Sequence, residues 1–284
     1  MLNPLEHGAT GHAAQAATGA AAADAPGSLA GTTWIGFRTI VHREYSRIIR
    51  IWAQTLVPSA VNTALYLLIF GTLFGRRVGA MAGFSYAQFL IPGMIMTWLI
   101  QNSYANVVSS FYGAKFGKHI EELLVSPLPN WVIVAGYMMG GIVRGMLVAM
   151  VVTAVSLVFA RLPIAHPGAI VAAALLTSAA FALAGLINAV FAKNFDQVNF
   201  VPTFVLQPLT YLAGVFYSIN MLPHAARVAS LVNPILYMVN AFRYGFLGVS
   251  DVALVPAFAM MAALAIVLFI VAVVLMNRGA GIRD

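Results

Sequence analysis

Long stretches without a charged side chain constrain this chain more than any other feature of its sequence. Asp, Glu, Lys and Arg are all absent from 51 to 75, 78 to 114, 123 to 143, 162 to 192, 197 to 226 and 252 to 277. An α-helix that crosses about 30 Å of hydrocarbon needs roughly 20 predominantly apolar residues. Each stretch can hold one such helix, so the sequence predicts a chain that crosses a bilayer several times.

The overall composition agrees with this interpretation. Hydrophobic residues make up 61% of the chain and charged residues 8%, whereas a soluble domain carries about 25% charged residues. We therefore predict an all-α integral membrane protein with six transmembrane helices. The spans are expected near 52–74, 86–111, 131–160, 168–192, 198–219 and 253–276.

The N-terminal part of the chain divides into two segments. Residues 1–31 are rich in Ala and Gly and contain no Lys or Arg, so they lack the basic start of a secretory signal. We interpret them as a disordered cytoplasmic extension and residues 32–284 as the transmembrane domain. That domain is expected to begin with an amphipathic helix at the membrane surface, because Trp34, Phe37 and Val41 recur at helical spacing between arginines. A soluble core helix is the alternative.

The distribution of basic residues predicts the orientation in the membrane. An even number of spans puts both termini on one side, and the positive-inside rule assigns the more basic side to the cytoplasm. One side has nine basic residues and the other five: Arg38, Arg43, Arg47, Arg50, Lys115, Lys118, Lys193, Arg278 and Arg283 against Arg76, Arg77, Arg161, Arg227 and Arg243. Both termini are therefore expected to be cytoplasmic. The chain has a net charge of +7, and its basic residues flank the apolar runs. This placement favours anionic lipid over nucleic acid as a partner.

No catalytic, metal or cofactor site is evident in the sequence. Gly113, Gly117 and Lys118 resemble a phosphate-binding loop only superficially, because the spacing is one residue short and His119 follows the lysine. The chain has no Cys, and the predicted spans carry no HExxH or GxSxG motif and no paired carboxylates. We expect the chain not to be an enzyme by itself, and any ATP to be bound elsewhere.

The charged loop after the second predicted span is a candidate docking element. Lys118, Glu121 and Glu122 precede a short apolar run, and Pro127 and Pro129 follow it. This order suggests a short interfacial helix that the prolines terminate. Such a helix could dock on a partner protein. The alternative is a solvated loop whose charges only set the topology.

The third predicted span has two unusual features. Its glycines form overlapping GxxxG spacings, which permit close helix contact either within the subunit or across a dimer; they are Gly136, Gly140, Gly141 and Gly145. Arg144 lies near the middle of the span, where a charge costs roughly 2.5 to 3.5 kcal/mol on insertion scales and is expected to face protein or water. Arg144 is a candidate pathway residue, and a structural arginine is the alternative.

Residues 220–250 interrupt the pattern of spans. Pro223, the Asn233–Pro234 pair and Arg243 divide apolar runs that are too short to cross a bilayer as helices. We predict a helical pair here that re-enters the membrane or lies on its outer surface. Non-helical backbone at membrane depth must be covered by protein or water.

Two stretches carry a resemblance to a known family. The first is the loop from Lys115 to Pro127, and the second follows the fifth predicted span. The second stretch includes Pro208, Tyr211, Gly214, Tyr217, Pro223, Asn233, Pro234 and Arg243. In their order and spacing both are similar to the ABC-2 type permeases of bacterial exporters, especially the YadH-like inner-membrane permeases. The resemblance extends over roughly 34–284.

The resemblance implies a six-span permease subunit of an ATP-binding cassette exporter. The first stretch would be its cytoplasmic coupling helix, with Lys118, Glu121 and Glu122 acting on the partner, and re-entrant helices would lie between spans five and six. The resemblance further implies a bacterial inner-membrane location, a homodimer of this chain and two ATPase chains at the cytoplasmic face. It does not identify the substrate.

The expected function is therefore ATP-dependent export through a pathway between two copies of this chain. An ion-coupled secondary transporter is one alternative, although it would need a carboxylate or His relay within the spans, and Asp and Glu fall in loops and termini here. A membrane scaffold without transport activity is the other alternative.

Overall fold

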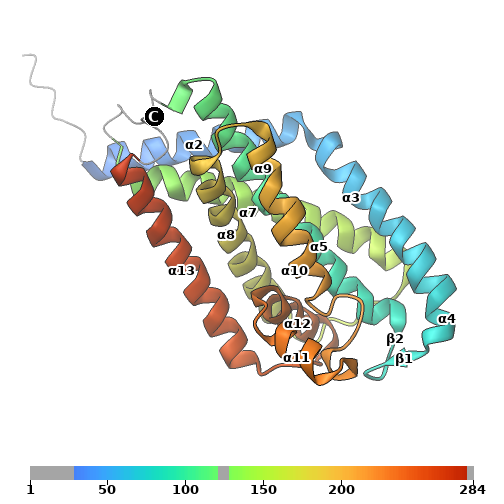
Figure 1. The fold of residues 1–284 in the computed structure, drawn as a ribbon. Coiled ribbons are helices and arrows are strands. Elements are labelled where there is room, and N and C mark those ends of the chain that lie inside the picture. Colours follow the sequence, from blue (N-terminus) through green and yellow to red (C-terminus); the bar gives the residue numbers. More distant parts are fainter. Residues whose placement is uncertain (1–28, 121–127, 280–284) are drawn as a thin grey trace, which may run out of the picture.

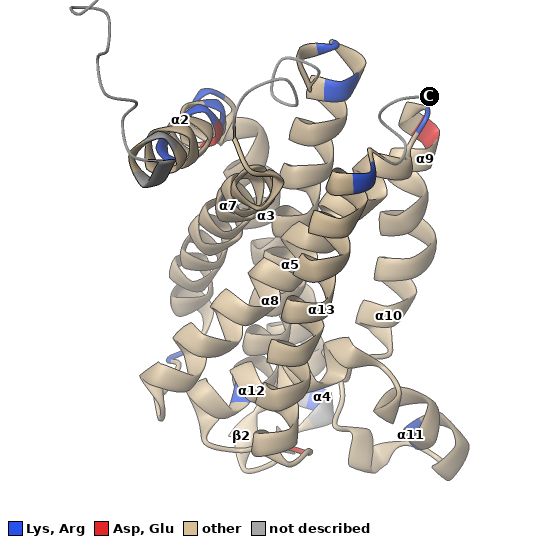
Figure 2. Ribbon diagram, turned by 90° about the vertical axis from the view of Figure 1, so that its left-hand side faces the viewer, with Lys and Arg blue, Asp and Glu red and all other residues tan. Residues whose placement is uncertain are grey.

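The computed structural model describes residues 29–120 and 128–279, most of which belong to one bundle of long helices (Figure 1). Within these residues, four helices are long and apolar enough to cross a membrane: Trp52–Phe74, Asn130–Phe159, Pro167–Phe191 and Leu254–Arg278. Charged residues gather towards the two ends of the bundle in Figure 2. The structure thus confirms a mostly helical membrane protein, whereas the six-span topology stays a prediction.

Helix α2 (Leu29–Arg50) lies across one end of the bundle (Figure 1). Leu29 to Gly31, the last residues of the predicted extension, form its first turn, and residues 1–28 lie outside the described part of the chain. Trp34 and Ile35 are exposed, while Ile40 and Ile48 are buried against the bundle. One face of α2 is therefore packed on protein.

The first long apolar helix packs against the bundle through small polar residues. It consists of α3 (Trp52–Tyr66) and a π-helical continuation, η1 (Leu67–Phe74), followed by α4 (Gly75–Val78). Its buried face carries Thr55, Ser59 and Thr63, and each hydroxyl donates to the carbonyl four residues earlier, at 2.7 to 3.2 Å. Small residues on the packed face are typical of helix contacts in lipid.

A short hairpin connects this helix to the centre of the bundle. Strand β1 (Ala80–Met81) pairs antiparallel with β2 (Phe84–Ser85). Ser85 then starts α5 (Tyr86–Phe116) with a capping box, because its hydroxyl accepts from the amide of Gln88 while the Gln88 side chain accepts from Ser85. This cap supplies partners for amide groups that a helix N-terminus leaves unpaired.

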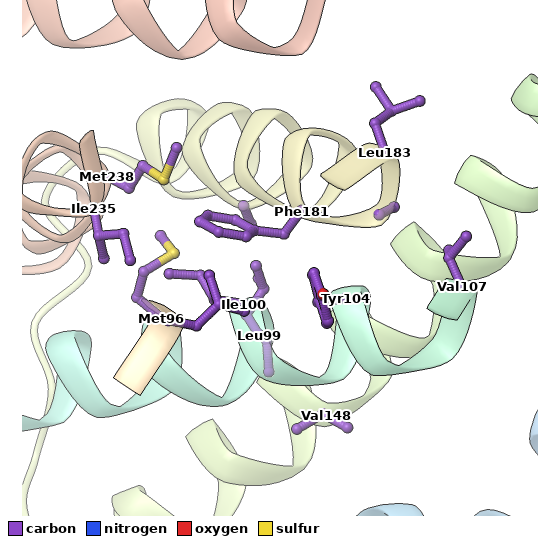
Figure 3. Close-up of a cluster of buried hydrophobic side chains, with 14 of the residues drawn as sticks. Met96, Leu99, Ile100, Tyr104, Val107, Val148, Phe181, Leu183, Ile235 and Met238 are labelled. Atoms are coloured by element: carbon purple, nitrogen blue, oxygen red, sulfur yellow. The ribbon is translucent and has the colours of Figure 1, made fainter. Parts of the chain in front are cut away.

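Helix α5 forms the core together with α7 (Asn130–Phe159) and α8 (Pro167–Phe191). In Figure 3, Phe181 of α8 lies over Leu99 and Ile100 of α5. Although α5 has 31 residues, it is not among the four most apolar helices, because polar residues such as Gln101, Asn102 and Ser103 lie at its middle.

The helix at the fifth predicted span is broken and shorter than predicted. It comprises α9 (Phe195–Val201), the π-helical turn η2 (Pro202–Leu206) and α10 (Gln207–Tyr211). The predicted span at 198–219 therefore starts three residues too late and ends eight too late. The helix cannot continue because Gly214 adopts a φ of 70°, in the left-handed region.

Two shorter helices and one long helix complete the chain. A 3₁₀ turn, η3 (Ile219–Met221), leads to α11 (His224–Leu231) and α12 (Pro234–Leu247), and α13 (Leu254–Arg278) returns along the bundle. Helix α12 packs against α5, α8 and α13, at the end away from α2 (Figure 1). The short pair thus closes that end of the bundle.

Candidate functional site

A polar cavity opens beside the middle of α5. It has a volume of about 230 Å³ and is lined by α3, α5, α10 and the turn after α10. Asn62 of α3, Gln101 of α5 and Gln207 of α10 supply amide groups, and Tyr66 and Trp98 supply aromatic walls. Polar groups and aromatic rings are thus mixed in one cavity of an otherwise apolar bundle.

A second cavity continues the first along α5. It also measures about 230 Å³, and it lies between α5 and the broken helix, with Ala105, Asn199 and Pro202 among its lining residues. Gln101 and Gln207 line both cavities. We call the two together the α5 groove. Its wall includes the π-helical turn η2, and such turns are frequent at functional sites.

The described residues provide no hydrogen-bond partner for the amides of the α5 groove. In the described part of the chain, the side chains of Asn62, Gln101 and Gln207 form no hydrogen bond, whereas the nearby Asn102 donates to the carbonyl of Trp98 at 3.0 Å. Asn62 and Gln207 are exposed and Gln101 is half-buried, so these amides are open to water or to a ligand in the groove. Covering them with lipid and no hydrogen bond would cost about 1 to 3 kcal/mol each on mutational scales.

Arg144, the predicted pathway residue, does not line the α5 groove. It lies on α7, partly buried, close enough to Arg47 of α2 for their charges to repel. Among the residues that the structure describes, its buried Nε atom has no partner, and the side chain forms none of the carbonyl or side-chain bonds expected of a structural arginine. Both interpretations of Arg144 therefore stay predictions.

The predicted coupling segment is described only in part. Lys118 is exposed and has a φ of 59°, while Glu121 and Glu122 lie outside the described residues. The stem of the segment is firmly attached, because Lys115 Nζ donates to the carbonyls of Val190 and Ala192 at 2.7 and 3.0 Å. A cation at these carbonyls also complements the C-terminal dipole of α8.

Aromatic rings join this stem to the start of the broken helix. The ring of Phe195 lies 5.0 Å from that of Tyr112 and 5.8 Å from that of Phe116, centroid to centroid. Asn194 caps α9 there by accepting from the amide of Gln197 at 2.9 Å. The end of α5 is thus in contact with the helix that forms one wall of the α5 groove.

The residues of the second resemblance stretch meet at the opposite end of the bundle. Arg243 is 1% exposed; its guanidinium carbon lies 3.8 Å from the ring centroid of Phe89, and one terminal nitrogen donates to the carbonyl of Gly214 at 2.7 Å. The hydroxyl of Tyr217 donates to the carbonyl of Tyr211 at 3.2 Å. This cluster fixes the turn after α10.

Asn233 and Pro234 of the same stretch begin α12. The Asn233 side chain accepts from the amide of Ile235 at 3.0 Å and donates to the carbonyl of Leu209 at 2.5 Å, and Pro234 occupies the first turn. Pro208 lies in the first turn of α10, and Pro223 is the N-cap residue of α11. These residues therefore lie at the starts of α10, α11 and α12.

Sequence reasoning missed two groups of residues. One is the set of groove amides, which a search for charges passes over; a search for isolated amides within charge-free intervals would have found Asn62, Gln101 and Gln207. The other is Glu44 of α2, which is 1% exposed although the helix was expected at the membrane surface. The sequence indicates the burial of Glu44 only weakly, through the presence of a single carboxylate in an arginine-rich helix.

Comparison with known proteins gives a consistent result. The family model of ABC-2 type transporters matches residues 36–247. The chain is 51% identical to the inner membrane transport permease YadH of Escherichia coli (strain K12) over 252 residues, covering 88% of this chain and 98% of the relative. It is 25% identical over 222 residues to nodulation protein J of Rhizobium leguminosarum bv. viciae, covering 77% and 83%.

Proposed function

This chain belongs to the ABC-2 type transporter family, and from that premise we propose that it is the permease subunit of an ATP-binding cassette exporter in a bacterial inner membrane. A separate ATPase chain binds and hydrolyses ATP, and two copies of the permease form the substrate pathway. The identity and coverage of the match to an inner membrane transport permease support the location and the transport role.

In the proposed topology the chain crosses the membrane six times. Helix α5 and the broken helix from α9 to α10 join the four apolar helices as spans, and α11 and α12 form the re-entrant pair between spans five and six. Both termini are cytoplasmic. The location of most charged residues near the two ends of the bundle supports this arrangement (Figure 2), because charged residues are disfavoured in the hydrocarbon between them.

The unpartnered amides of the α5 groove carry the proposal of a pathway. Asn62, Gln101 and Gln207 come from three helices and face one cavity, so a hydrated or substrate-filled groove satisfies them together. Alternating access requires that the groove be exposed differently in different ATPase states. Such a change in exposure requires a contact with the ATPase that differs in strength between the ATPase states. We assign this contact to the coupling segment with Lys118, Glu121 and Glu122.

Because the chain has no Cys, a single introduced thiol reports water access to the groove. We expect Gln101→Cys, in the complex reconstituted with its ATPase, to react with a water-soluble maleimide at a rate that ATP changes several-fold. The matched control is Val267→Cys on α13, a side chain that is 56% exposed on an apolar face and should be shielded by lipid.

The same reporter separates the alternatives. A Gln101→Cys thiol as unreactive as the Val267→Cys thiol would contradict an aqueous pathway. Reactivity that follows a proton or sodium gradient and ignores ATP would indicate a secondary transporter. Reactivity that neither ATP nor an ion gradient changes would indicate a scaffold.

A further inference from the structure

A cluster of charged side chains lies where α2 crosses α7 and α5. Glu44 accepts from Arg47 at 3.1 Å, from the Asn106 amide at 3.3 Å and from the Ser110 hydroxyl. Arg47 also donates to the carbonyl and the side-chain oxygen of Asn106, both at 2.8 Å. This one carboxylate is therefore fully engaged by its neighbours.

Arginine is in excess at this crossing. Arg43 donates to the Tyr137 hydroxyl at 2.6 Å and lies over its ring, and Arg144 is close enough to Arg47 for their charges to repel. Of these three guanidinium groups, Arg47 alone is bonded to Glu44, the one carboxylate that the described residues place there. Arg43 is exposed, whereas Arg144 is partly buried, where an uncompensated charge is costly.

Arg144 is the member of the cluster without a partner. In the part of the chain that the structure describes it forms no hydrogen bond, its Nε is buried, and its two terminal nitrogens are not enclosed. The alternative partners nearby are already used, since Glu44 and Asn106 are bonded to Arg47. The described residues therefore leave the terminal nitrogens of Arg144 open to water or to a bound group.

The level of Arg144 in the membrane suggests which group this is. A Cβ at Gly136 would lie 2.6 Å from Ile40, and one at Gly140 would lie 2.8 Å from Glu44. Arg144 continues this contact stripe one turn further, which is about 6 Å along the helix. An arginine side chain can extend over such a distance to place its charge at the headgroup level, which is where α2 lies.

We propose that Arg144 binds the phosphate of an anionic phospholipid at the crossing of α2 and α7. The two terminal nitrogens of Arg144 are free to contact two phosphate oxygens, the bidentate geometry that guanidinium groups favour. The lipid compensates the excess charge and fastens α2 to the bundle. This inference does not depend on the ATPase or on the transported substrate.

The test measures lipid binding to the purified full chain in an uncharged detergent. Added phosphatidylglycerol is expected to raise the unfolding midpoint of the wild-type chain more than phosphatidylcholine does, because a ligand of the native state stabilises it. Arg144→Gln should need about tenfold more phosphatidylglycerol for half of the effect, the equivalent of one charge-assisted hydrogen bond. Arg161→Gln, an exposed arginine beyond the other end of α7, is the matched control and should behave as wild type.

Three results would overturn the proposal. These are an unchanged phosphatidylglycerol requirement in Arg144→Gln, an equal loss in Arg161→Gln, and equal stabilisation by inorganic phosphate alone, which would indicate a site for free anions. If Arg144→Gln cannot be purified, Arg144→Lys takes its place. Lysine keeps the positive charge but lacks the planar guanidinium that can contact two phosphate oxygens. Native mass spectrometry should therefore show weaker lipid retention, and unchanged retention would exclude the bidentate contact.

Discussion

Arg243 carries a full charge in a place that excludes water. Its side chain is 1% exposed, its guanidinium carbon lies over the Phe89 ring at 3.8 Å from the centroid, and one nitrogen donates to the Gly214 carbonyl at 2.7 Å. Two of its nitrogens have no partner among the described residues. The ring face and the carbonyl thus replace part of the lost hydration, because a desolvated cation–π contact contributes about 2 kcal/mol.

We expect Arg243→Lys to lower the free energy of unfolding by about 2 kcal/mol, because a lysine ammonium lacks the planar surface that stacks on Phe89. Thermal unfolding in detergent measures the change. Arg227→Lys is the matched control, since Arg227 is exposed on α11, and a surface substitution there should stay within about 0.5 kcal/mol. Equal shifts in the two variants would mean that the stack contributes nothing.

At the scale of elements, glycines decide how closely the helices approach. A Cβ at Gly141 would lie 2.5 Å from Ala182 of α8, and one at Gly145 would lie 2.0 Å from the Ser103 hydroxyl of α5. The other two glycines of α7, Gly136 and Gly140, accommodate α2. All four therefore serve contacts within the subunit, which resolves the alternative that the GxxxG spacings left open.

Gly185 of α8 tests this close packing, because a Cβ there would lie 2.6 Å from the backbone carbonyl of Tyr104, an atom that cannot move without shifting α5. We expect Gly185→Ala to destabilise the chain by about 1 to 3 kcal/mol, the usual cost of overpacking. Gly113→Ala is the control within a helix: nothing lies within 4 Å of its Cβ, so the change should be neutral or stabilising by up to about 1 kcal/mol. A melting comparison that ranks the two variants the other way would contradict the proposed contact.

The helices could be predicted more fully than the contacts between them. A charge-free interval located α8 at 168–192, against Pro167–Phe191 in the structure, because lipid demands an apolar run of fixed length. The end of α10 was missed because it depends on the left-handed Gly214. The burial of Glu44 and the convergence of Asn62, Gln101 and Gln207 depend on which faces meet, and no periodicity within a single helix contains that information.

At the scale of the whole molecule, the broken helix along the α5 groove links the two ends of the bundle. At the end with α2, Lys115 and Phe195 attach the stem of the coupling segment to α8 and α9. The broken helix then passes along the groove to the turn at Gly214, which Arg243 holds. We therefore expect a displacement at the stem to reach the groove wall through this contiguous packing, which includes the π-helical turn η2.

Glu121 and Glu122 are predicted to start this displacement, although they lie outside the described residues. Reversing both charges, Glu121→Lys with Glu122→Lys, should weaken assembly with the ATPase or abolish the ATP-dependent change in Gln101→Cys labelling, because charge-assisted bonds to the partner become repulsive. The unfolding midpoint of the isolated subunit should stay unchanged. Glu6→Lys with Asp24→Lys makes the same change in net charge within the N-terminal extension and should leave both readouts intact. Compensating reversals on the ATPase are expected to restore labelling, since a coupling contact acts only through its different strength in the two ATPase states. If the double reversal at 121 and 122 assembles and responds to ATP normally at physiological salt, the charges of this loop only set the topology.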